Sequence, residues 1–110
     1  MNVRVVSKEN MLCAYLNGEI DHHTARDIRQ AIDTTVEKSH PRHLVLDFSG
    51  VQFMDSSGIG LVMGRYKLMQ AMGGDVTVCG LSPKLEKIVT LSGLSKLIKI
   101  ERMKSNETNE

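Results

Sequence analysis

Short apolar runs alternate with longer segments of helical periodicity along this chain. Two runs rich in apolar and β-branched residues come first, at 3–7 and 11–16, and the turn-like sequence KEN between them favours a hairpin. After Gly18 the apolar positions recur every three or four residues, which predicts a helix ending at His40-Pro41. The apolar stripe of this helix consists of Ala25, Ile28, Ile32, Thr35 and Val36.

The middle of the chain repeats the alternation of strand and helix. Residues 43–48 (HLVLDF) place apolar side chains on both faces, which is typical of a central strand. Residues 58–72 have helical periodicity and are followed by two helix-stopping glycines, Gly73 and Gly74. The stripe of this second helix contains Ile59, Val62, Met63, Tyr66 and Met69.

The last third predicts one more strand and one more helix. The strand is DVTVCG (75–80), and the helix begins with Ser82 as N-cap and Pro83 at the first helical position. A short strand at 97–100 ends the pattern. The order ββαβαβα(β) indicates an α/β fold: a mixed β-sheet with helices packed on it and right-handed crossover connections.

Composition narrows the classes of protein that this chain can represent. It has 110 residues, of which 41% are hydrophobic and 25% charged, and a net charge of +1, so one ordinary globular domain is expected. The charge provides no strong attraction to nucleic acid or acidic membranes. No apolar run is long enough for a membrane span and the N-terminus is not a secretory signal, so a cytoplasmic protein is expected. Cys13 and Cys79 lie in strand-like runs and are interpreted as buried, reduced thiols.

The stretch FMDSSGIG, residues 53–60, lies between the central strand and the second helix. A helix start needs one capping side chain, and Asp55, Ser56 and Ser57 are all candidates. The surplus suggests that a serine is presented for modification, while plain capping stays open. A catalytic serine is disfavoured because the nucleophile-elbow pattern G-x-S-x-G is absent.

Two further features each allow a structural and a functional interpretation. The glycines in GIGLVMG follow G-x-G-x-x-x-G, so tight helix–sheet packing is favoured over a nucleotide-binding turn at Gly58 and Gly60. In GEIDHHTA (18–25), Asp21 can cap the first helix. His22 and His23 are adjacent on that helix and point apart, so surface histidines are expected rather than a metal site.

Four segments together resemble a known family, the anti-sigma factor antagonists, which share the STAS domain. They are GEIDHHTA (18–25), FMDSSGIGLVMGRYK (53–67), GGDVTVCGLSP (73–83) and LSGLSKLIKI (91–100). The resemblance is strongest to the sporulation members from endospore-forming bacteria. It implies a STAS domain over residues 1–100, and residues 101–110 form a polar tail expected to fray.

In this family the first serine of the D-S-S/T-G motif is phosphorylated, which implies Ser56 here. The implied partners are an anti-sigma factor with serine kinase activity and a serine phosphatase. The resemblance implies no enzymatic activity, no cofactor or metal, no direct contact with nucleic acid or membrane, and a monomer when free. Two alternatives stay open: a small nucleotide-binding enzyme using the Gly58/Gly60 turn, and a scaffolding STAS module.

The partner surface is expected where the two loops meet. If strands 11–16 and 43–48 are parallel, their carboxyl ends lie at one edge of the sheet, where binding sites gather. The expected partner-binding residues are Asp21, His22, His23, Asp55, Ser56, Ser57 and Gly58.

Overall fold

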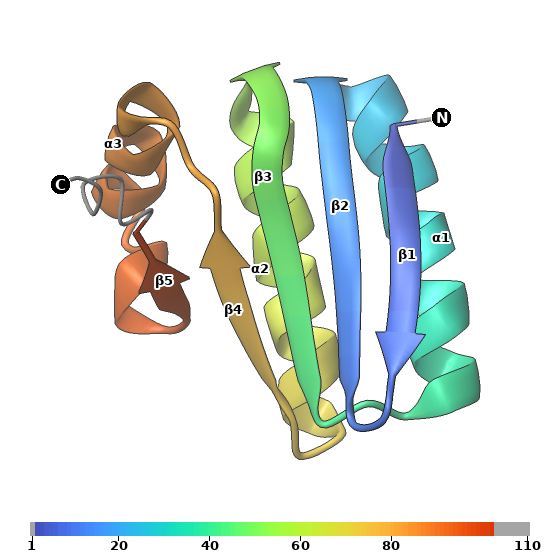
Figure 1. Ribbon diagram of the computed structural model, residues 1–110. Helices are drawn as coiled ribbons and strands as arrows, with labels where there is room; N and C mark the ends of the chain where they lie inside the picture. Colours follow the sequence, from blue (N-terminus) through green and yellow to red (C-terminus); the bar gives the residue numbers. More distant parts are fainter. Residues whose placement is uncertain (1, 103–110) are drawn as a thin grey trace, which may run out of the picture.

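A computed structural model describes residues 2–102 as a five-stranded sheet with three α-helices (Figure 1). The sheet order is β1-β2-β3-β4-β5; β1 is antiparallel to β2, and all other neighbouring strands are parallel. This confirms the predicted mixed α/β fold, the hairpin and the central position of β3. The elements are β1 Val3–Lys8, β2 Met11–Ile20, α1 His22–Ser39, β3 His43–Met54, α2 Ser56–Ala71, β4 Asp75–Cys79, α3 Pro83–Leu91, the 3-10 helix η1 Leu94–Lys96 and β5 Lys99–Glu101.

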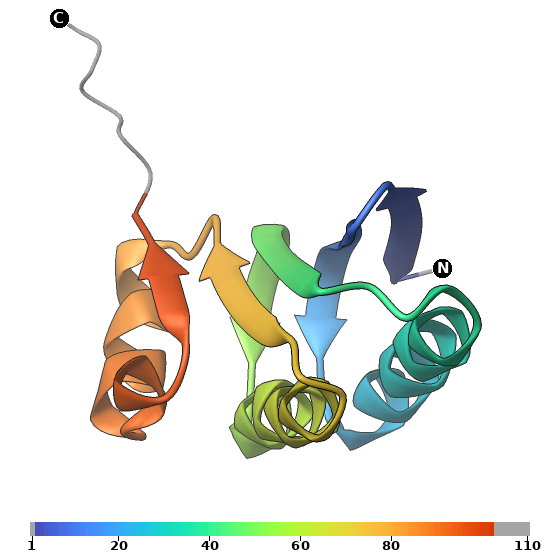
Figure 2. The same ribbon diagram turned by 90° about the horizontal axis from the view of Figure 1, so that it is seen from below.

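The core lies between the sheet and the helices: α1 and α2 cover one face of the sheet, and α3 lies beside β5 at its edge (Figure 2). Side chains alternate along a strand, so every second residue of each central strand points at the helices. These residues are fully or almost fully buried and aliphatic apart from one phenylalanine: Leu12, Ala14, Leu16, Leu44, Leu46, Phe48, Val76 and Val78. The buried residues of α1 that complete this layer are Ile28, Ile32 and Val36. The predicted stripe of α1 is thereby confirmed as buried at three of its five positions, while Ala25 and Thr35 are half-buried.

The two parallel central strands are longer than the sequence pattern predicts. β2 continues past residue 16 to Ile20 and β3 past residue 48 to Met54, and the two extensions pair with each other through register shifts. Gly50 permits this close approach, because a Cβ there would lie only 2.8 Å from Cβ of Asn17. The extensions carry the chain to the starts of α1 and α2, where the motif residues lie.

Smaller differences occur at other element boundaries. Helix α2 begins at Ser56, two residues earlier than predicted, because Asp55 provides the cap. The final strand is shifted to Lys99–Glu101, and η1 precedes it. Glu101 therefore belongs to the sheet, and Arg102 contacts Glu86 of α3 at 2.8 Å. The rest of the expected tail, residues 103–110, lies outside the described residues.

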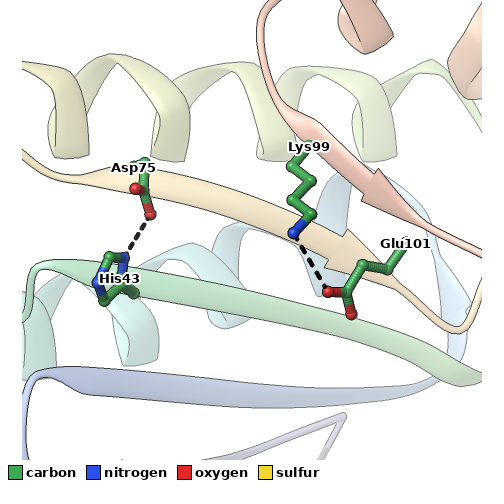
Figure 3. A network of polar contacts seen from close by, with 4 residues as sticks. All are labelled: His43, Asp75, Lys99 and Glu101. Atoms are coloured by element: carbon green, nitrogen blue, oxygen red, sulfur yellow. Dashed lines mark hydrogen bonds and ion pairs between the residues drawn. The ribbon is translucent and has the colours of Figure 1, made fainter.

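The other face of the sheet carries no helix within residues 2–102 (Figure 2). Two polar pairs lie on this face: His43 Nδ1 is 2.9 Å from Asp75 Oδ1, and Lys99 Nζ is 3.6 Å from Glu101 Oε2 (Figure 3). All four side chains are at least half exposed, so each pair contributes less than about 1 kcal/mol.

Cys13 and Cys79 are free thiols on β2 and β4 and are only half-buried. Each alternates with residues that point at the helices, so both side chains lie on the uncovered face. The expectation of fully buried core cysteines was therefore wrong. Strand alternation explains this, because the same apolar run supplies both the covered and the uncovered face.

Candidate functional site

The starts of α1 and α2 lie side by side at the carboxyl ends of β2 and β3. Ile20 and Met54, the last residues of the two strands, are paired in register. The backbone N–H of Asp55 donates a hydrogen bond to the carbonyl of Ile20 at 3.1 Å. The predicted neighbourhood of the Asp21 loop and the Ser56 loop is therefore confirmed.

Asp21 caps α1 through a capping box. Its Oδ1 accepts hydrogen bonds from the backbone N–H groups of His23 and Thr24, both at 2.9 Å, while Thr24 Oγ1 accepts from the N–H of Asp21. The bond from the Thr24 N–H is the main reason why the pKa of Asp21 lies below its ordinary value. His22 and His23 follow in the first turn and are exposed, as predicted.

Asp55 performs the same role for α2. Its Oδ1 accepts a hydrogen bond from the Ser57 N–H at 2.8 Å, and its carbonyl accepts one from the Gly58 N–H at 3.0 Å. Ser56 is the first residue of the helix and is exposed. Within residues 2–102 its hydroxyl makes no hydrogen bond to the protein, so the hydroxyl is available to another molecule.

Ser57 and Gly58 differ from what the motif suggests. Ser57 contributes its backbone N–H rather than its hydroxyl to the cap, and its side chain is half-buried. Gly58 is buried, and a Cβ there would lie 2.6 Å from Sδ of Met54. Gly58 therefore packs closely on the end of β3, and a direct contact between Gly58 and a partner stays a prediction.

The alternative of a nucleotide-binding turn is not supported by this geometry. Gly58 and Gly60 both lie inside α2, so they form no glycine-rich loop before the helix. Gly58 performs the predicted packing role. Gly60 and Gly64 do not, because a Cβ at either position would meet no other atom within 4 Å.

Sequence reasoning missed a groove between α1 and α2. It has a volume of about 380 Å³ and is lined by His22, Ala25, Arg26, Arg29, Ser57, Gly60, Leu61, Gly64 and Arg65. Arg65 is 6% exposed and lies 2.9 Å from Asp33 Oδ1 through its Nε. One feature of the sequence could have indicated that Arg65 is buried. It stands four residues from both Leu61 and Met69, which are buried on the same helix.

The Asp33–Arg65 pair has the distance of an ion pair but not the alignment of a hydrogen bond. Burial raises the pKa of Asp33 and lowers the pKa of Arg65, and their mutual attraction opposes both changes. Among the described residues, Arg65 Nη1 is buried and has no hydrogen-bond partner.

Within residues 2–102, no three His, Cys, Asp or Glu side chains gather in a way that could hold a metal ion. None of the helices in that range is long and apolar enough to cross a membrane.

The fold and the arrangement of the two capped helix starts define a STAS domain. The sequence profile of the STAS domain matches residues 2–107, and the chain belongs to this family. Its relatives include the anti-sigma F factor antagonist of Paenibacillus polymyxa, which is 37% identical over 111 residues that cover 99% of this chain and 92% of the relative.

Solved structures of the anti-sigma factor antagonist SpoIIAA share the fold. The unphosphorylated form has a TM-score of 0.81 at 29% identity, with 96% of this chain and 90% of that chain covered. The phosphorylated form from Bacillus has a TM-score of 0.74 at 29% identity, with 96% and 94% covered.

Proposed function

We propose that this protein is an anti-sigma factor antagonist switched by phosphorylation of Ser56. In its unphosphorylated form it binds an anti-sigma factor that is also a serine kinase, and the sigma factor is released. Phosphorylation by that kinase inactivates it, and a serine phosphatase restores it. The protein acts as a regulator in the cytoplasm rather than as an enzyme, and its similarity to the F-factor antagonists favours a role in sporulation.

The observation that carries this proposal is the state of the Ser56 hydroxyl. Asp55 already caps α2, so the hydroxyl is exposed and has no hydrogen bond within the described part of the chain. A kinase can therefore reach it without first opening the helix. Ser57 is half-buried beside it and is the poorer substrate.

The position of Ser56 at the start of α2 also explains how a phosphate can act without refolding the domain. A phosphoserine adds a charge of roughly −1.5 to −2, and the positive end of a helix dipole tolerates an anion. The likeness of this fold to SpoIIAA in both its forms supports the same view. The added charge acts instead on a docked partner, which must desolvate it.

The proposed partner surface consists of the exposed and half-buried residues of the two helix starts. These are Asp21, His22, His23, Asp55, Ser56 and Ser57. Gly58 is the next residue of α2 and packs on Met54 at the end of β3. Asp21 and Asp55 keep their capping bonds in this arrangement, so the surface is held rigid before a partner arrives.

The test is the intact mass of the protein after incubation with its anti-sigma kinase and ATP. Wild type and Ser57→Ala should each gain one phosphate, and Ser56→Ala should gain none. A phosphate mapped to Ser57 would overturn the assignment of the site. An unmodified wild type that still binds the anti-sigma factor would favour the alternative of a purely scaffolding STAS module.

A further inference from the structure

The groove between α1 and α2 combines open space with a concentration of positive charge. Three arginines and one histidine line it: Arg26, Arg29, Arg65 and His22. Among residues 2–102 no acidic side chain lines the groove, although Asp33 lies 2.9 Å from Arg65 and offsets its charge. The whole chain carries a net charge of only +1, so this concentration is local.

The floor of the groove is open because two of its residues are glycines. Gly60 and Gly64 are one helical turn apart on α2, and neither position is crowded by a neighbour. A helix gains roughly 1 kcal/mol when such a glycine becomes alanine. Glycine therefore costs stability here and gains nothing in packing, which is consistent with a molecule entering between the helices.

The side chain of Arg65 gives the main evidence for a ligand. It is more than nine-tenths buried, and it lines the groove. Asp33 Oδ1 lies 2.9 Å from its Nε, Arg29 is a second charged neighbour, and Nη1 has no hydrogen-bond partner among the residues described. Protein atoms cover Nη1 itself, so an anion in the groove would act on Arg65 through the charge of its guanidinium and through the part of the side chain that lines the groove.

We propose that the α1–α2 groove is a binding site for a phosphate group. Arginine presents several N–H donors in a planar fork, which matches the paired oxygens of phosphate better than a single point charge does. Arg65 lies within the site, and Arg26 and Arg29 complete it from α1. The group could belong to a free phosphate ion or to a larger phosphorylated molecule, and the chemistry of recognition is the same.

The groove does not include the proposed phosphorylation site Ser56, although His22 and Ser57 belong both to the groove and to the proposed partner surface. Ser57 lines the groove and Ser56 does not, although the two residues are neighbours on α2. Binding in the groove requires neither a kinase nor an anti-sigma factor, so it can be tested on the isolated protein. Failure of this test therefore leaves the proposed function untouched.

The experiment is a titration of the ¹⁵N-labelled protein followed by NMR. Inorganic phosphate is one ligand and O-phosphoserine the other, with chloride used to hold ionic strength constant. Saturable shifts are expected at Ser57, Gly60 and Gly64. If O-phosphoserine binds more tightly, the phosphate group belongs to a larger molecule. If inorganic phosphate binds more tightly, the ligand is the free ion.

Two pairs of variants separate the groove from general charge effects. Arg29→Gln should weaken binding about tenfold through loss of charge-assisted hydrogen bonds, whereas Arg42→Gln, at the opposite end of β3, should not. Gly64→Leu should block the groove, whereas Gln70→Leu on the exposed surface of the same helix should leave binding unchanged. Arg65 need not be altered, so the fold is preserved.

Three results would overturn the proposal. The first is a shift that grows with any anion and never saturates. The second is equal weakening by Arg29→Gln and Arg42→Gln, which would indicate screening of the whole surface. The third is equal affinity for acetate, which would make the groove a site for carboxylates rather than phosphate.

Discussion

At the scale of single residues, the DSSG motif divides two tasks between two neighbouring side chains. Asp55 accepts the bond that a helix start requires, and Ser56 is left with a free hydroxyl. A serine used as the cap would have its oxygen engaged and its side chain turned inward. The order of the two residues therefore separates the capping role of Asp55 from the proposed modification of Ser56.

Asp21 makes the capping role testable through pH. Its pKa is lower in the folded protein, so its contribution to stability is present above the ordinary pKa of aspartate, about 3.9, and is lost as pH falls through the lower folded value. Asp21→Ala should lower the melting temperature at pH 7. The difference from wild type should shrink below pH 4.

Asp27→Ala is the control for this prediction, because Asp27 is exposed on the same helix and caps nothing. Thermal unfolding of the three proteins at pH 7 and pH 3 is the measurement. A difference between Asp21→Ala and wild type that stays constant over this range would show that the ionised cap is not the source of the effect.

Cys79 provides a second prediction at this scale. Burial, aided by the carboxylate of Asp47, raises the pKa of its thiol to about 11. At pH 8 the thiolate fraction is then roughly 200-fold below that of an ordinary thiol of pKa about 8.5. In a Cys13→Ala background, iodoacetamide should modify Cys79 roughly 200-fold more slowly in the folded protein than in urea. Equal rates would contradict this.

At the scale of elements, the features that depend on a few consecutive residues could be predicted from the sequence, whereas those that depend on strand pairing could not. The caps at Asp21 and Ser82 and the stops after α1 and α2 could be predicted, because each depends on a few consecutive residues. The extension of β2 and β3 could not. Gly18 and Gly50 are typical of turns, and only the pairing of the two strands places them inside strands, with Gly18 (φ 83°) at a register shift.

The same distinction applies to the candidate site: one part depends on local motifs and the other on contacts between distant segments. The two helix starts could be predicted from their motifs and from the rule that parallel strands end at one edge. The groove could not, because it depends on which faces of α1 and α2 meet. Asp33 and Arg65 are far apart in the sequence, and nothing local to either residue indicates the other.

The glycines of α2 permit a paired prediction at this scale. Gly64→Ala should stabilise the protein by about 0.5–1 kcal/mol, since the new Cβ gains helix propensity and meets no neighbour. Gly58→Ala should lose that gain or reverse it, because its Cβ would lie 2.6 Å from Met54 Sδ. Urea unfolding of both variants checks the difference. Equal changes in the free energy of unfolding would contradict the packing at Gly58.

At the scale of the whole molecule, the proposed switch is a change of charge on a domain that keeps one conformation. The two helix starts are fixed by their caps, by the paired ends of β2 and β3, and by an aliphatic core beneath them. Nothing in this arrangement requires a second conformation. A local charge is sufficient, because a partner that covers Ser56 must remove water from the phosphate.

The most direct test of this account is the affinity of the two forms for the anti-sigma factor. The cost of desolvating the phosphate, about 2–4 kcal/mol, should raise the dissociation constant roughly 30- to 1,000-fold. Ser56→Asp carries less charge and should have an intermediate value. Calorimetry with unphosphorylated protein, protein phosphorylated on Ser56, and Ser56→Asp should therefore give three ordered constants. Equal constants for the first two would contradict the central claim.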